Sequence, residues 1–228
     1  GAIPALVDKL DPRGCVPGQV RLLGALANLL PVPENATAAV ECGALVRLIT
    51  MGDADAPPVL EFLVLALRLL CDQERWKLPL VQAGLAECLL RLLARFAPGA
   101  PDGARREARS VCAGGAAMLS ALAGREALHT RLLDAGVAPA LAQLLGCPAH
   151  MTQTRAARAA ALLAASERGK EAAREAGQIA PLAWLVGSRH LPLRVECAKA
   201  IRQLSPNNAN KRLLVTPRTR PAHPAHPF

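Results

Sequence analysis

The sequence predicts an all-α solenoid, a protein built from helical units stacked one after another, and three observations lead to this prediction. Five glycines open similar apolar phrases at intervals of 42, 41, 52 and 41 residues, a period typical of helical repeats. Apolar residues recur at helical spacing between these glycines. Apolar residues make up 52% of the chain and charged residues 20%, which is enough to bury a long core. The repeat-turn glycines are Gly1, Gly43, Gly84, Gly136 and Gly177.

A first helix is expected directly before each of the last four glycines. Glycine permits a positive φ and a close approach of backbones, which a sharp turn between two helices requires. A second helix is expected after the glycine, and in three units its first turn contains a proline, namely Pro4, Pro139 or Pro181. Proline is tolerated there because that amide has no acceptor within the helix. The segments that end in the glycines are 38–43, 80–84, 132–136 and 173–177.

A third and longer helix is expected to complete each unit. The second helix is followed by a loop rich in polar residues, glycine or proline, as in 51–58 and 187–192. In the unit that opens at Gly43, the second helix is expected to stop early, at Gly52. Three helices per unit are more than the two-helix hairpins of shorter repeats contain. The third helices are expected within 19–30, 59–70, 108–123, 154–166 and 193–205.

The repeated phrase resembles the armadillo repeat family. Its units contain an apolar residue shortly before Ala-Gly, an Ile-Pro or Ala-Pro step after the glycine, and a second helix rich in leucine. The likeness covers residues 1–216 and is best at Gly1–Leu30 and Leu132–Leu145. HEAT repeats have a similar length but lack the glycine turn and the third helix. The resemblance implies an all-α, right-handed superhelical solenoid of three-helix armadillo repeats.

The expected organisation is one continuous armadillo array over 1–216, followed by a Pro/His-rich disordered tail at 217–228. The longest glycine interval places an insertion at Phe96–Arg106, which is interpreted as neutral, with a functional loop as the alternative. Because Gly1 is itself a turn glycine, the chain is expected to be a fragment of a longer protein. The expected divisions are a partial unit 1–31, units at about 32–72, 73–124, 125–166 and 167–206, and a partial first helix 207–216.

The charge of the chain favours a protein partner over nucleic acid. The net charge is +9, but four of the cations lie in the acid-free segment that begins at Asn207, which leaves +5 for the rest. This excess is compatible with acidic protein segments or an anionic membrane face, and it is too diffuse to indicate nucleic acid. With no Tyr, three Phe and two Trp, the chain also lacks the rings that stack on unpaired bases.

The cysteines predict a reducing compartment. The chain has seven of them, an odd number, spread along the repeats without a CxxC pair. This pattern is typical of small core residues, so we expect a cytoplasmic or nuclear protein, or one found in both. The longest strongly apolar stretch is interrupted by Glu61 and Arg68, so neither a membrane span nor a signal peptide is expected.

The armadillo resemblance implies that the third helices line a concave groove that holds extended peptides, often through an asparagine on each helix. Nuclear-import adaptors of the family carry tryptophan one turn earlier. No tryptophan occurs there in this chain, so it is not expected to be of the import-adaptor type. The expected asparagine position holds Asn28, Leu69, Ala121, Ala164 and Gln203, and the expected tryptophan position holds Gly24, Leu65, Ala117, Ala160 and Lys199.

The expected groove has a small, apolar floor with basic residues beside it, which suits an acidic or amphipathic partner segment. The alternative interpretation is that the apolar residues pack neighbouring helices and that the arginines form a solvated face. No oligomeric state follows from the sequence. The candidate partner-binding residues are Arg21, Asn28, Arg68, Arg155, Arg158, Arg194, Lys199, Arg202 and Gln203.

No catalytic, cofactor or small-molecule site is expected. His129, His150 and His190 stand singly, without a second ligand at helical spacing, so a metal site has no support. The favoured function is a non-catalytic scaffold for protein-protein interaction. One alternative is the substrate-recruiting armadillo segment of a larger ubiquitin ligase, because Asn210 and Lys211 resemble the first helices of such proteins in plants and algae. The other alternative is a membrane-docked adaptor.

Overall fold

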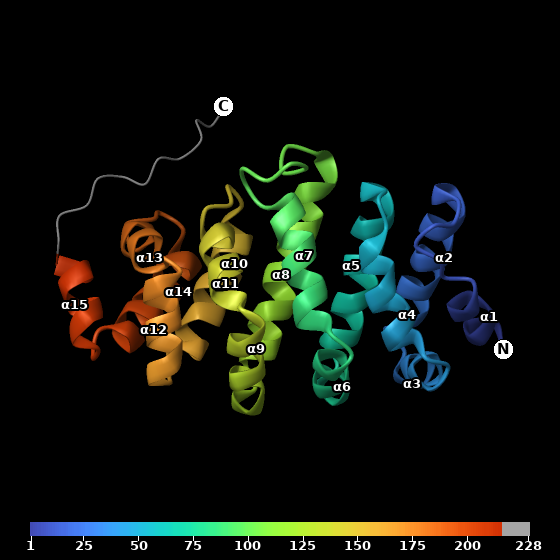
Figure 1. The fold of residues 1–228 in the computed structure, drawn as a ribbon, viewed down its shortest axis with the longest axis horizontal. Helices are drawn as coiled ribbons and strands as arrows, with labels where there is room; N and C mark the ends of the chain where they lie inside the picture. The colour runs from blue at the N-terminus through green and yellow to red at the C-terminus, as the bar shows by residue number, and fades with distance from the viewer. Residues whose placement is uncertain (216–228) are drawn as a thin grey trace. The chain divides into compact units, whose positions relative to one another are not determined.

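A computed structural model describes residues 1–215, and all the regular elements in this range are helices (Figure 1). The expected tail at 217–228 lies outside the described residues. The chain forms two compact units, which divide after Met118. Unit 1 comprises Gly1–Met118, and unit 2 begins at Leu119.

Unit 1 contains the predicted succession of short first and second helices and a longer third helix. Its third helices are α2, α5 and α8, and α8 continues into unit 2. In bounds, the elements are α1 (Ala2–Asp8), α2 (Val16–Leu29), α3 (Pro33–Glu41), α4 (Ala44–Thr50), the 3-10 turn η1 (Met51–Asp53), α5 (Pro57–Cys71), η2 (Glu74–Trp76), α6 (Lys77–Gln82), α7 (Leu85–Phe96) and α8 (Arg106–Ala123).

Unit 2 repeats the same order twice and then begins a further first helix. Its complete third helices are α11 and α14, and both have 14 residues. The elements after α8 are η3 (Glu126–Leu128), α9 (His129–Ala135), α10 (Val137–Leu145), α11 (His150–Leu163), α12 (Glu167–Glu175), α13 (Ile179–Leu185), α14 (Leu191–Leu204) and α15 (Asn208–Val215).

Four of the five repeat-turn glycines adopt the left-handed backbone conformation between a first and a second helix. Their φ angles are 81° at Gly43, 97° at Gly84, 85° at Gly136 and 70° at Gly177. Side chains with a Cβ rarely adopt this conformation, so glycine lets the chain reverse direction within a residue or two. Among residues 1–215, no residue other than glycine has a positive φ.

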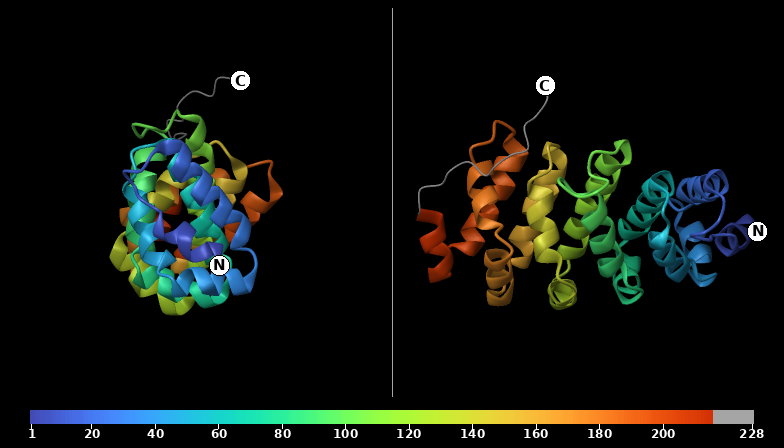
Figure 2. Two further views of the ribbon diagram at one scale, coloured as in Figure 1. Left: turned by 90° about the vertical axis from the view of Figure 1, so that its right-hand side faces the viewer. Right: turned by 45° about the horizontal axis from the view of Figure 1, so that its top comes forward.

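The third helices pack side by side within each unit. In unit 1, α2 lies against α5, and in unit 2, α11 lies against α14 (Figure 1 and Figure 2). Leucines such as Leu63 and Leu67 of α5 are fully buried, and each contributes about 1.5–3 kcal/mol of transfer free energy. In α11 the buried residues are mostly alanines, whose small side chains allow close packing.

The longest glycine interval is taken up between α7 and α8, after Phe96 and before Arg106. The carboxylate of Asp102 closes this loop, because it pairs with the Nε atoms of Arg95 and Arg105. Arg95 also donates from Nη1 and Nη2 to the backbone oxygens of Ala54 and Asp55, at 3.2 and 2.5 Å. The insertion therefore has a defined structure joined to the preceding turn of unit 1.

Candidate partner-binding surface

The two complete third helices of unit 2 can be compared residue by residue, because α11 and α14 have equal lengths. His150 corresponds to Leu191, so each residue of α11 matches the residue 41 positions later in α14. Thr152 and Leu193 are both buried under this correspondence, as are Ala156 and Cys197. The shared burial supports the correspondence, since equivalent positions face the same neighbours in a repeat stack.

The correspondence corrects the expected position of the amide residues. The sequence paired Gln203 with Ala164, but Ala164 is the C-cap of α11 and is buried. The residue equivalent to Gln203 is Leu162, which is half-buried. Asn28 in unit 1 is exposed and Gln203 in unit 2 is half-buried, so both amides reach the surface of their own unit.

The same correction applies one turn earlier in the helix. The sequence paired Lys199 with Ala160, which is buried. The residue equivalent to Lys199 is Arg158, and both side chains are exposed. The two cations therefore occupy the same position on neighbouring helices, about 8–10 Å apart between helix axes.

Arg194 and Arg202 lie on another side of α14. Their equivalents in α11 are Gln153 and Ala161, which are buried, whereas both arginines are exposed. These arginines therefore occupy the side of α14 that corresponds to the packed side of α11. We define the third-helix face of unit 2 without them, as Arg155, Arg158 and Leu162 of α11 with Val195, Lys199 and Gln203 of α14.

The third-helix face of unit 2 carries an excess of positive charge. Helix α11 contains no acidic residue, and α14 contains only Glu196. The Glu196 carboxylate accepts a hydrogen bond from Lys199 Nζ at 2.8 Å. An exposed ion pair of this kind contributes little to the stability of the fold. Lys199 can therefore exchange Glu196 for an acidic residue of a partner at a small cost in free energy. Arg155 and Arg158 add two further cations to the face.

The third helices of unit 1 have a different balance of charge. Arg68 is paired with Asp72 at 3.3 Å, and Glu61 accepts a hydrogen bond from Ser110 at 2.7 Å. The Phe62 ring lies over Gly24, where a Cβ would be 3.6 Å from its Cε1. Leu65 and Leu69 are half-buried, while Arg21 is exposed. This surface is more apolar, and its charges are largely paired within unit 1.

Comparison by sequence gives no match to a family model and none to a curated protein. Comparison of folds matches a structure described as computationally designed armadillo repeat proteins for modular peptide recognition. Its TM-score is 0.79 at 22% sequence identity, over 93% of this chain and 86% of that one. A designed armadillo repeat protein in complex with peptide (KR)4 has a TM-score of 0.76 at 22% identity, over 94% and 87% of the two chains. The chain has the armadillo-repeat fold.

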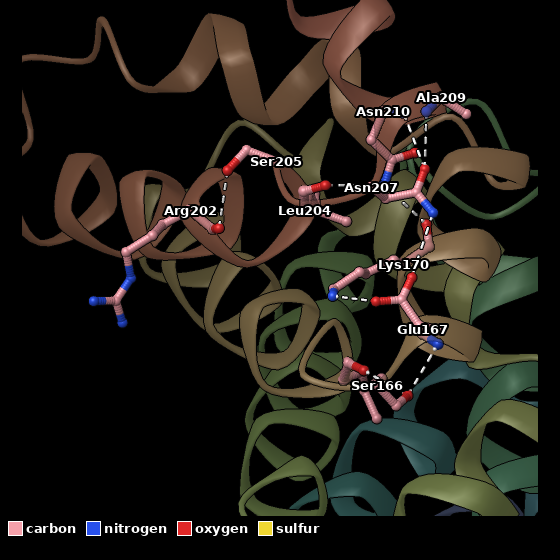
Figure 3. Close-up of polar contacts among 11 residues, drawn as sticks. Ser166, Glu167, Lys170, Arg202, Leu204, Ser205, Asn207, Ala209 and Asn210 are labelled. Carbon is pink, nitrogen blue, oxygen red and sulfur yellow. Dashed lines mark hydrogen bonds and ion pairs between the residues drawn. The ribbon is translucent and has the colours of Figure 1, made fainter.

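A polar cluster joins α12, the first helix of one armadillo repeat, to α15, the first helix of the next (Figure 3). The Glu167 carboxylate accepts hydrogen bonds from Lys170 Nζ at 2.6 Å and from Asn207 Nδ2 at 3.5 Å. Lys170, followed by Asn207, holds the pKa of Glu167 below its ordinary value. Asn210 is fully buried and donates to the backbone oxygens of Leu204 and Lys170, at 3.2 and 3.4 Å. This cluster fixes α15 on the repeat before it.

The role of Asn210 removes an argument for the ubiquitin-ligase alternative. The sequence singled out Asn210 and Lys211 for their resemblance to first helices of that class. In the structure, Asn210 closes the end of the preceding third helix, which is a packing role. Lys211 is exposed and donates to Asn208 Oδ1 at 3.4 Å. The pair therefore does not favour a ligase over another armadillo protein.

The structure brings two of the three histidines together. His150 at the start of α11 and His190 at the N-cap of α14 stack with ring centroids 5.2 Å apart, although the sequence suggested that both stand singly. His129 contacts the Ala123 backbone oxygen through Nε2 at 2.8 Å. Within the described residues, no three His, Cys, Asp or Glu side chains are grouped to hold a metal.

The expectation that all seven cysteines are core residues is wrong for two of them. Cys15 and Cys42 are exposed, because they lie at helix ends, at the N-cap of α2 and the C-cap of α3. The other five are buried, and all seven are free thiols. Within the part of the chain that the structure describes, no helix is both long and apolar enough to cross a membrane.

Proposed function

We propose that this armadillo-repeat chain is a non-catalytic scaffold that binds an acidic or amphipathic segment of a partner protein on the third-helix face of unit 2. The observation that carries the proposal is the equivalence of Arg158 and Lys199, which puts two exposed cations side by side on neighbouring helices. Acidic side chains of a partner would complement these charges. The half-buried Leu162 beside them offers apolar contact.

The comparisons support a peptide as the kind of partner. One designed armadillo neighbour is described as serving modular peptide recognition, and another is in complex with peptide (KR)4. That peptide is cationic, whereas the third-helix face of unit 2 has more cations than carboxylates. We therefore propose the opposite charge preference for this chain, since like charges at an interface oppose binding.

The proposal includes no catalytic step and no cofactor. The residues that define the third-helix face are cations, aliphatic side chains and one amide, without a nucleophile and base in contact. We also propose that the protein works in the cytoplasm or the nucleus, which the seven free thiols support. Imaging of the tagged protein in cells checks this, and secretion of the tagged protein would contradict it.

The binding experiment compares the peptides (DE)4 and (KR)4. We expect the wild-type chain to bind (DE)4 more tightly, and the double variant Arg158→Glu, Lys199→Glu to bind it about tenfold more weakly. The matched control is Arg131→Glu, an exposed cation on the first helix α9, which should leave the affinity unchanged. Equal binding of (DE)4 by the wild type and the double variant would contradict the proposed face.

A further inference from the structure

The amino ends of α11 and α14 expose large apolar side chains at the edge of the third-helix face, to which Val195 itself belongs. Met151 is 54% exposed, Leu191 57% and Val195 42%. We call these three residues the apolar cluster. Exposing side chains of this size forgoes the free energy that their burial would provide, so a partner that covers them gains it on binding.

Residues at the equivalent positions of the other third helices are accessible as well. Ser110 and Pro192, which correspond to Met151, are exposed, and His150, which corresponds to Leu191, is also exposed. Thr154, which corresponds to Val195, is only half-buried, even though the third helix α14 packs against α11. The positions of Met151 and Leu191 are therefore exposed in each third helix compared, whereas the position of Val195 is more exposed in α14 than in α11.

Ring stacking joins the two amino ends, and each histidine also makes a hydrogen-bond contact within its own helix end. The rings of His150 and His190 stack between α11 and α14. His150 Nδ1 contacts Gln153 Oε1 at 3.3 Å, and His190 Nδ1 accepts a hydrogen bond from the Leu193 amide at 3.4 Å. Contacts of this kind orient the helix ends before a partner arrives, which lowers the ordering cost of binding.

The apolar cluster lies within reach of the cations along the same helices. Lys199 follows Val195 by four residues, and Arg158 follows Met151 by seven. At 1.5 Å per residue, these separations are about 6 and 10 Å along the helix axes. An extended peptide advances about 3.3 Å per residue, so the same distances correspond to two or three of its residues.

We infer that the partner segment carries an apolar anchor residue on the apolar cluster and acidic residues two or three positions away from it on Arg158 and Lys199. This inference rests on the proposed function and specifies the sequence of its partner. Acidic residues alone would meet only the cations, and an apolar residue alone would meet only the cluster. The spacing between them therefore determines which acidic segments are selected.

Three peptides of matched length test this inference in NMR titrations of the isotope-labelled chain. In the first, GSDDGLGDDSG, leucine has aspartates two and three residues away on both sides. The second, LGSGSGGDDDD, has the same composition with leucine far from the aspartates, and the third, GSDDGGGDDSG, has no leucine. We expect the first peptide to bind about tenfold more tightly than the other two, as burial of one leucine predicts.

Variants of the chain assign the effect to the apolar cluster. The double variant Met151→Ala, Val195→Ala should bind all three peptides with nearly equal affinity, while Val46→Ala, an exposed apolar residue of α4, should preserve the preference. Equal affinity of the wild-type chain for the first two peptides would overturn the inferred spacing. Equal affinity for the first and third would overturn the anchor and leave the proposed acidic preference standing. Failure to bind any of them would overturn both.

Discussion

Gly114 of α8 lies so close to Val64 of α5 that a Cβ atom at residue 114 would be 2.2 Å from Val64 Cγ1. Valine is stiff at χ1, so its methyl group cannot easily turn away. The neighbouring Gly115 faces Leu93 of α7, where a Cβ would be 3.2 Å from Leu93 Cδ2. The glycine pair therefore lets α8 approach both a third and a second helix of unit 1.

The first prediction is that Gly114→Ala destabilises the protein, although alanine is the better helix former. The clash with Val64 should lower the free energy of unfolding by about 1–3 kcal/mol, measured by urea denaturation. Gly24→Ala is the matched control, since its Cβ would meet Phe62 at an ordinary contact distance of 3.6 Å. That variant should gain about 0.4–1 kcal/mol. Equal effects of the two substitutions would contradict the close approach.

The second prediction concerns Gly136, at the turn between α9 and α10. A Cβ at this residue would have nothing within 4 Å, so only its φ of 85° opposes another side chain. Gly136→Ala should therefore cost about 1–2 kcal/mol in urea denaturation. Gly136→Asn should cost less, because asparagine tolerates the left-handed conformation better. Equal costs for alanine and asparagine would show that another contact is responsible.

The order of helices could be predicted from the sequence because the signals are local. A turn glycine, a following leucine-rich segment and a loop with proline or glycine mark the ends of helices such as α10. The third helices start a few residues earlier than expected, as α14 does at Leu191, since the polar and proline residues of the preceding loop fit a first helical turn.

The alignment of α11 was missed because the helix itself lacks a landmark, although the 41-residue interval from Gly136 to Gly177 already implies it. Alanine occupies most of its buried positions, so a shift of two residues changes the apolar pattern very little. The wrong pairing of Ala160 with Lys199 follows from this uniformity. The bounds of α11 and α14 agree with this interval and show that Arg158 is the equivalent cation. Likewise, it is the packing of α11 that shows that Arg194 lies on a different side of α14 from Lys199.

A recurring cap was missed in the sequence although it leaves a signal there. Asn35 and Asn210 donate from Nδ2 to the backbone oxygen six residues earlier, Leu29 or Leu204, each at 3.2 Å. His129 contacts Ala123 at the same separation. A polar residue six positions after the end of a third helix, as found after α2, α8 and α14, could have revealed it. After α5, Trp76 lies five residues beyond Cys71, and its Nε1 is buried without a hydrogen-bond partner among residues 1–215.

The third prediction concerns thiol reactivity. Burial raises the pKa of Cys71 and Cys197 to about 12 and that of Cys88 to about 11, so few of these thiols ionise at pH 8. Alkylation of the native chain at pH 8 should modify Cys15 and Cys42 first, as mass spectrometry of the digested protein would show. In urea, all seven cysteines should react at similar rates. Early modification of Cys71 in the native chain would contradict its burial.

The fourth prediction is that the loop between α7 and α8 loses its support in acid. Hydrogen bonds from Arg95, followed by Arg105, hold the pKa of Asp102 below its ordinary value. A carboxyl whose pKa is lower in the folded state stabilises that state above its unfolded pKa of about 4, and this contribution is lost as the pH falls through the folded value. Asp102→Asn should therefore destabilise the protein at pH 7 and have less effect at each lower pH.

Urea denaturation of wild type and variant at pH 7 and pH 3 measures this difference. Asp55→Asn is the control, because Asp55 contributes its backbone oxygen to Arg95 rather than its carboxylate. The control should show a small effect at both pH values. An Asp102→Asn effect of the same size at pH 7 and pH 3 would mean that the Asp102 charge does not hold the loop.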